Sequence, residues 1–183
     1  VPYFGVLPEW FDQWVANMEV LKPLGYDYLL VTNLKRFEQR VRDKLGIEPA
    51  ITPGTGKLWD YRCAFGVLFE EELKGYDFWG HTDFDCVYGN VDKWVTDEFL
   101  EGLDIHSNHG TYMCGPWSLY RNTEKVNKLF YDSPSWMKIM TTPEITGWVE
   151  MEFSRTVENS GLRYKYTYWQ GKDPDKWQNV TYK

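Results

Sequence analysis

The chain of 183 residues carries a net charge of −7, and 18% of its residues are aromatic. This length is typical of one domain that buries roughly 70% of its unfolded surface, so we expect a single domain over residues 1–183, either complete or part of a longer protein. The acidic balance argues against nonspecific nucleic-acid binding, which relies on basic patches. No apolar run approaches the ~20 residues of a membrane span, and no signal peptide is visible.

The first half of the chain alternates predicted strands with predicted helices. Apolar runs predict the strands, and apolar residues at helical spacing, such as Phe37, Val41 and Leu45, predict the helices. This alternation indicates βαβ units and an α/β fold with a mainly parallel central sheet flanked by helices. The predicted elements are strand Val1–Phe4, helix Pro8–Leu21, strand Tyr26–Thr32, helix Leu34–Leu45, loop Pro49–Gly56, helix Trp59–Leu73 and strand Tyr76–Thr82.

The second half of the chain adds helices and two further strands. The polar segment His106–His109 is predicted to be a loop, in which histidines are mostly structural or exposed. Gly161 is expected to close the last helix. The predicted elements are helix Asp92–Leu100, strand Thr111–Leu119, helix Thr123–Tyr131, helix Thr146–Asn159 and strand Arg163–Trp169.

Three predicted strands of the first half end in residues that are able to bind a ligand. These ends are Gly5, Thr32–Asn33 and Asp83–Asp85. In open α/β sheets, ligands bind beyond the carboxyl ends of parallel strands. We therefore expect the three ends to converge on one cleft.

Asp83-Phe84-Asp85 is the most informative motif in the chain. The two acids follow an apolar-aromatic strand, and residues two apart in an extended segment point the same way. At the turn that leaves the strand, both carboxylates can reach one hard cation. Mn²⁺ and Mg²⁺ favour such oxygen ligands and often share them with substrate phosphates. The alternative is a solvated acidic turn or a helix N-cap.

Four segments in order resemble nucleotide-sugar glycosyltransferases with the GT-A fold. The closest likeness is to small enzymes of capsular polysaccharide clusters and of large DNA viruses that glycosylate their own capsids. The resemblance implies a single GT-A-like domain. It rests on Val1–Gly5 with the following Leu7-Pro8, on Lys57–Gly66, on Leu73–Val91 around the two acids, and on Ser118–Asn122.

The resemblance also implies roles for particular residues. Asp85 would contact Mn²⁺ or Mg²⁺ directly, while Asp83 would hold the donor ribose or a water on the metal. Lys57, Asp60 and Arg62 would hold the base, ribose or diphosphate of the donor, and arginine suits a bidentate phosphate contact. A salt-bridge group at the surface is the alternative interpretation of these three residues.

Further candidates lie at the other strand ends. Asn33 follows Thr32 where the resembling family often has Thr-Asp, so its amide is expected to contact the base, and Tyr3 is expected to stack on it. A strand-end turn alone would also explain these residues. The late histidine that many of these enzymes use as a metal ligand has no counterpart, because no histidine follows His109.

Glu150 and Glu152 are the candidates for a catalytic base. An inverting transferase needs a carboxylate that takes the proton of the acceptor hydroxyl, and the resembling family has an acid just before a segment like Phe153-Ser154-Arg155. The two side chains point about 200° apart on a helix, so at most one faces the cleft, and spacing favours Glu152. A solvated helix acid is the alternative.

These observations predict a metal-dependent glycosyltransferase that moves a sugar from a nucleotide-diphosphate donor, UDP in preference to GDP, to a glycan or glycoprotein acceptor. Capsule or viral capsid glycan synthesis is the implied process. The alternatives are a sugar nucleotidyltransferase and a noncatalytic carbohydrate-binding module. Motifs of P-loop, Rossmann dinucleotide and serine hydrolase sites are absent from the sequence. The three cysteines are widely spaced and form no C-x-x-C pair, which argues against a zinc site. Cys86 and Cys114 lie in apolar runs, which predicts reduced core thiols and a cytosolic protein.

Overall fold

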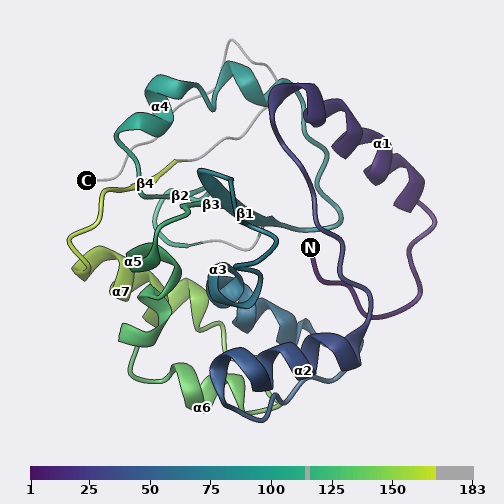
Figure 1. Cartoon of the computed structure of the whole chain (residues 1–183), viewed down its shortest axis with the longest axis vertical. Helices are drawn as coiled ribbons and strands as arrows, with labels where there is room; N and C mark the ends of the chain where they lie inside the picture. The colour runs from purple at the N-terminus through teal and green to yellow at the C-terminus, as the bar shows by residue number, and fades with distance from the viewer. Residues whose placement is uncertain (114–115, 168–183) are drawn as a thin grey trace.

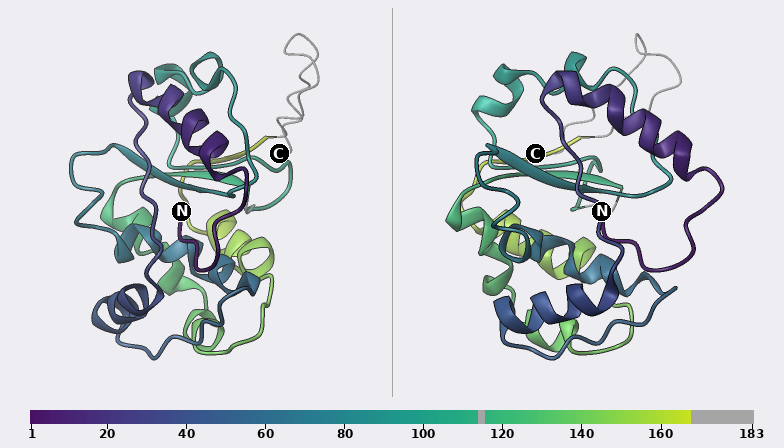
Figure 2. Two further views of the ribbon diagram at one scale, coloured as in Figure 1. Left: turned by 90° about the vertical axis from the view of Figure 1, so that its right-hand side faces the viewer. Right: turned by 45° about the vertical axis from the view of Figure 1, so that its right-hand side comes forward.

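A four-stranded mixed sheet lies at the centre of this α/β fold, between two layers of helices (Figure 1). The computed structural model describes residues 1–113 and 116–167. Two helices, α1 (Phe11–Leu21) and α4 (Asp97–Glu101), lie on one side of the sheet (Figure 2). The opposite layer contains α2 (Leu34–Leu45), α3 (Phe65–Leu68), α5 (Glu124–Asn127), α6 (Trp136–Met140) and α7 (Ser154–Asn159).

The sheet is mostly antiparallel, so the prediction of a mainly parallel sheet was wrong. Its strands are β1 (Phe78–Thr82), β3 (Trp117–Arg121), β2 (Ile105–Ser107) and β4 (Tyr164–Tyr166), in that spatial order. Only β2 and β4 are parallel. For the β2–β3 pair, the reason is their short connection, which contains no helix in its described part. A parallel return needs a long crossover, whereas an antiparallel one does not.

The first two predicted strands do not join the central sheet. Val1–Phe4 and Tyr26–Thr32 meet in one isolated parallel bridge, where the Tyr3 amide donates to the Val31 carbonyl over 2.8 Å. Residues 26–29 and strand β1 border a cavity of about 330 Å³ instead of pairing with each other. The apolar pattern of Tyr26–Thr32 predicted a buried strand, but none of its residues is buried and only Val31 forms a bridge. Such a pattern does not determine which backbone supplies the hydrogen bonds.

Several predicted helices are broken into shorter turns. The predicted helix Trp59–Leu73 begins as a 3₁₀ helix, Gly56–Ala64, and Val149–Phe153 is a π-helix that leads into α7. The segment at His106, predicted as a loop, is strand β2. The last strand was predicted to run to Trp169, and its residues from 168 onward lie outside the described part. In the two described ranges, no helix has the length and apolar character needed to cross a bilayer. The other 3₁₀ helices are Lys22–Leu24, Val91–Lys93 and Leu129–Asp132.

Each face of the sheet packs against its own hydrophobic core. Trp79, Tyr120 and Ile105 are neighbours in the strand register and belong to the core with α2, α3 and α5–α7. The rings of Trp79 and Tyr120 are stacked with centroids 4.2 Å apart. Leu119 faces the other way, into the core formed with Trp14 of α1. The alternation of side chains along β3 therefore joins the two helical layers to one sheet.

We expect Gly80→Ala to lower the free energy of unfolding by about 1–3 kcal/mol, the usual cost of overpacking. A Cβ atom at Gly80 would lie 2.5 Å from the carbonyl oxygen of Ser118 on the neighbouring strand β3. Because the obstacle is sheet backbone, it cannot move aside as a side chain would. Urea denaturation measures the change. Gly102→Ala is the control, since its added Cβ meets nothing within 4 Å, and equal stability of both variants would contradict the prediction.

Candidate functional site

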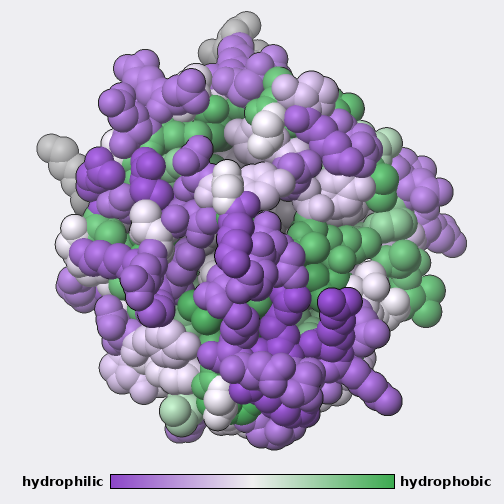
Figure 3. Space-filling view, in the orientation of Figure 1, coloured by the Kyte–Doolittle hydropathy of each residue, from purple (hydrophilic) through white to green (hydrophobic). Residues whose placement is uncertain are grey.

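The carboxyl end of β1 opens into a cleft of about 590 Å³. Its walls come mainly from the N-terminal residues 1–6, the loop 51–56, the 3₁₀ helix Gly56–Ala64 and residues 81–85. Hydrophobic side chains gather on the neighbouring surface between α1 and α2, where the N-terminal segment runs (Figure 3). The cleft therefore lies where segments far apart in the sequence meet, as expected for two of the three predicted strand ends.

A stack of aromatic rings holds the acidic turn at the edge of the cleft. The ring of Phe84 stacks on Trp14 with centroids 4.5 Å apart and on Phe11 at 5.6 Å. Tyr3 packs against the same ring at 4.8 Å. Both acids that flank Phe84 line the cleft. The packing of Phe84 thus places two carboxylates in one pocket, at the turn that leaves β1.

The carboxylates differ in their surroundings. Oδ1 of Asp83 accepts a hydrogen bond from Nη2 of Arg62, and the two side chains form an ion pair that is 27% and 10% exposed, respectively. Asp85 is exposed and takes part in no hydrogen bond or ion pair within the part of the chain that the structure describes. One acid is therefore neutralised by a cationic side chain, while the other is available to a ligand.

Trp59 is a further residue of the cleft that sequence reasoning missed. Its ring is 53% exposed, and the guanidinium carbon of Arg62 lies 5.7 Å from its centroid. An exposed ring beside a cation offers a flat face to a sugar or a base. The only signal in the sequence was its position within the segment Lys57–Gly66. Nothing in that segment distinguished an exposed tryptophan from a core one.

The sequence model of one protein family matches residues 29–181, described as a family of unknown function (DUF6625). The chain belongs to the DUF6625 family. The matched range contains Arg62, Asp83 and Asp85 and begins after Tyr3. No curated protein and no solved structure matches the chain.

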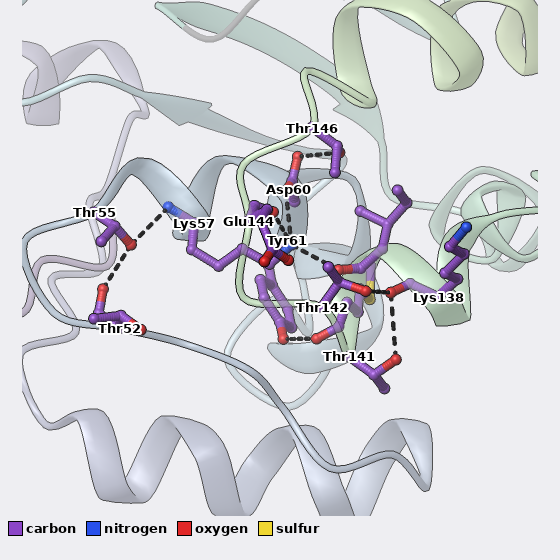
Figure 4. A network of polar contacts seen from close by, with 12 residues as sticks. Thr52, Thr55, Lys57, Asp60, Tyr61, Lys138, Thr141, Thr142, Glu144 and Thr146 are labelled. Atoms are coloured by element: carbon purple, nitrogen blue, oxygen red, sulfur yellow. Dashed lines mark hydrogen bonds and ion pairs between the residues drawn. The ribbon is translucent and has the colours of Figure 1, made fainter.

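Lys57 and Asp60 of this DUF6625 protein lie beneath the cleft rather than in its lining. Both are fully buried, and Lys57 Nζ lies 2.9 Å from Asp60 Oδ2 (Figure 4). The other two donors of the ammonium go to the carbonyls of Ile139 and Glu144, at 2.6 and 2.9 Å. Thr146 donates to the second oxygen of Asp60 over 3.3 Å. All three N–H groups of Lys57 are thus used to tie the 3₁₀ helix to residues 139–146.

The candidates for base recognition are divided between the cleft and the surface. Tyr3 lines the cleft, where its hydroxyl donates to the Val6 carbonyl over 2.9 Å. Thr32 and Asn33 are exposed and do not line it. The Asn33 side chain instead caps α2 by accepting from the Arg36 amide over 3.0 Å. Asn33 therefore begins a helix in the DUF6625 fold, whereas the sequence had offered a strand-end turn as the alternative to base contact.

Neither glutamate proposed as a catalytic base lines the cleft. Glu150 is exposed. Oε1 of Glu152 accepts from the Ser133 hydroxyl, the Ser135 amide at 3.0 Å and the Trp148 indole at 3.3 Å. Burial raises the pKa of Glu152, but these hydrogen bonds outweigh burial and hold the pKa below its ordinary value of 4.5. The carboxylate is thereby held ionised and fixed to the segment before α6.

We expect Glu152→Gln to lower the free energy of unfolding at pH 7 by about 1–3 kcal/mol, because hydrogen bonds to a charged acceptor are stronger than those to an amide. A depressed pKa contributes stability that is complete above the unfolded value and is lost as the pH falls through the folded value. The difference between wild type and Glu152→Gln should therefore shrink below about pH 4. Urea denaturation across pH measures it. Glu150→Gln is the control, and a difference that persists at low pH would exclude this role.

Proposed function

We propose that this DUF6625 protein is a metal-dependent glycosyltransferase that binds a nucleotide-diphosphate sugar in the cleft at the end of β1. One observation carries the proposal: Arg62, Asp83 and Asp85 come from two separate segments and meet in a single cleft. A diphosphate needs a cationic side chain, and a divalent ion beside it needs carboxylates. The resemblance of the four sequence segments to GT-A glycosyltransferases supports the same conclusion. From that resemblance we also propose that the α/β domain has a GT-A-like fold.

The described residues suggest how a donor would be held. Arg62 is bound to Asp83 through one nitrogen only, so its remaining N–H groups are available for phosphate oxygens. The exposed face of Trp59 lies next to that guanidinium, and Tyr3 lies in the same cleft. We assign diphosphate binding to Arg62 and stacking on the base or sugar to the two aromatic rings. Lys57 and Asp60 support Arg62 from below, by fixing the helix that carries it.

The carboxylates present fit a hard divalent cation. Asp85 has no competing partner in the described chain, and Oδ2 of Asp83 is not used by Arg62. No cluster of three or more His, Cys, Asp or Glu side chains occurs among the described residues, so phosphate and water would supply the other ligands, as is usual for Mg²⁺. Bound there, Mn²⁺ or Mg²⁺ would stabilise the negative charge that develops on the leaving diphosphate.

We propose UDP in preference to GDP as the nucleotide, and a hydroxyl of a glycan or glycoprotein as the acceptor, from the resemblance alone. Asp83 and Asp85 are the only acids among the described residues of the cleft lining. Glu150 and Glu152 lie outside that lining, so the proposal assigns them no role in donor binding. Free thiols at Cys63 and Cys86 support the cytosol as the compartment.

Isothermal titration calorimetry with UDP and Mn²⁺ tests the proposal. A glycosyltransferase should bind UDP with Mn²⁺ present, and a screen of nucleotide sugars should then detect slow Mn²⁺-dependent hydrolysis of one donor. A carbohydrate-binding module would ignore UDP and Mn²⁺ and bind a glycan through rings such as Trp59. A sugar nucleotidyltransferase would release pyrophosphate from a nucleoside triphosphate and a sugar phosphate. Absence of UDP binding at millimolar Mn²⁺ would overturn the proposal.

A further inference from the structure

The ion pair between Arg62 and Asp83 is part of the lining of the cleft. Arg62 projects from the 3₁₀ helix Gly56–Ala64, and Asp83 follows β1, so the pair joins two walls of the cleft. The Arg62 residue is only 8% exposed, and Trp59 packs beside it. In this ligand-free structure the guanidinium is thus paired with an acid that the proposed function assigns to a metal ion.

A guanidinium and a divalent cation compete for the same carboxylate. While Nη2 of Arg62 contacts Oδ1 of Asp83, a cation bound to that carboxylate would lie close to a fixed positive charge. The repulsion between the two cations opposes metal binding. An incoming diphosphate removes this repulsion, because planar N–H pairs bind phosphate oxygens bidentately and the phosphates add negative charge between the two cations.

We propose that Arg62 is a latch that couples nucleotide binding to metal binding. Without nucleotide, Arg62 neutralises Asp83 and lowers the affinity of the cleft for the cation. With nucleotide, the guanidinium turns to the diphosphate and Asp83 becomes available to the metal. This inference rests on the proposed function, since it requires a phosphate ligand in the cleft. It assigns Arg62 a positioning role that differs from a simple contribution to donor affinity.

Arg62→Met provides the critical measurement, because methionine keeps much of the side chain's bulk and removes its charge. By titration calorimetry without nucleotide, Arg62→Met should bind Mn²⁺ at least about fivefold more tightly than wild type, the lower end of typical coupling between sites. The same variant should bind UDP more weakly when Mn²⁺ is saturating. Opposite changes in the two affinities are the signature of the latch, since loss of a purely structural contact would weaken both.

Two further variants separate the latch from general electrostatics. Arg42→Met removes one positive charge from an ion pair with Glu48 that is not part of the cleft lining, and it should leave Mn²⁺ affinity close to the wild-type value. Arg62→Lys keeps a charge beside Asp83 but loses the planar fork. It should bind Mn²⁺ as wild type does and bind UDP more weakly. Circular dichroism verifies that each variant is folded, and Arg62→Gln replaces Arg62→Met if the methionine variant is not.

The outcomes distinguish the inference from the function on which it rests. If wild type binds neither Mn²⁺ nor UDP, the proposed function fails, and the latch fails with it. If wild type binds both, but Arg62→Met binds Mn²⁺ alone no more tightly than Arg42→Met does, the latch is wrong and the proposed function stands. If Arg62→Lys behaves like Arg62→Met toward Mn²⁺, the charge of residue 62 is not what opposes the metal, and the inference is also overturned.

Discussion

We expect the Asp85→Asn protein to lose at least about 100-fold in Mn²⁺-dependent UDP affinity, because loss of an outer-shell partner alone typically costs ~10–100-fold in metal affinity. Asparagine keeps the shape of the side chain and removes the charge that a hard cation requires. Asp85 is exposed and takes no part in the hydrogen bonds or ion pairs of the described chain. The melting temperature should therefore stay close to that of wild type.

Calorimetry with UDP at saturating Mn²⁺ measures the effect of Asp85→Asn. Asp92→Asn is a matched control, since Asp92 is also an exposed aspartate and does not line the cleft. Wild-type affinity in Asp85→Asn would show that this carboxylate is not a metal ligand. Equal losses in both variants would point to overall charge rather than to a site.

The second large effect is expected from the buried pair beneath the cleft. Lys57→Met should lower the free energy of unfolding by about 3–5 kcal/mol, the usual cost of breaking a buried ion pair. Among the described residues, methionine leaves the buried Asp60 carboxylate with only the Thr146 hydroxyl as a donor. It also leaves the carbonyls of Ile139 and Glu144 without their ammonium. Urea denaturation at neutral pH measures the change.

Two variants control this measurement. Lys128→Met removes an exposed lysine that pairs with Glu124 on α5, and stability should change little because exposed ion pairs contribute little. Lys57→Met combined with Asp60→Leu removes both buried charges and should recover much of the loss. If Lys57→Met is as stable as Lys128→Met, the pair does not hold the 3₁₀ helix in place.

The sequence predicted the elements whose signals are local. Helix α2 has the bounds Leu34–Leu45 that its apolar spacing indicated, with Asn33 and Gly46 at its two ends. Strand β1 also follows from its apolar run. In both cases the deciding residues are neighbours along the chain, so spacing and end signals are sufficient.

Other features depend on contacts that the local sequence does not encode. Strand β2 was predicted as loop because His106 and Ser107 are polar, yet both are fully buried. A lysine followed three residues later by an aspartate, as at Lys57 and Asp60, looks the same in the sequence whether the ion pair is exposed or buried. Carbonyls about 80 residues further along the chain decide between them here. The acidic pair and Arg62 were both predicted to lie at the cleft, and both line it. The ion pair that joins Arg62 to Asp83 could be found only from the structure.

The aromatic stack around Phe84 has a consequence for the thermodynamics of ligand binding. A turn that carries two acids loses conformational entropy when a ligand orders it. Here the rings of Trp14, Phe11 and Tyr3 hold Phe84 before any ligand arrives. That entropy is lost during folding, so a cation meets carboxylates whose backbone is already ordered. If Phe84 were replaced by a small residue, the turn would lose this conformational entropy only when the cation binds. The affinity for the cation would then fall, even though both acids remained.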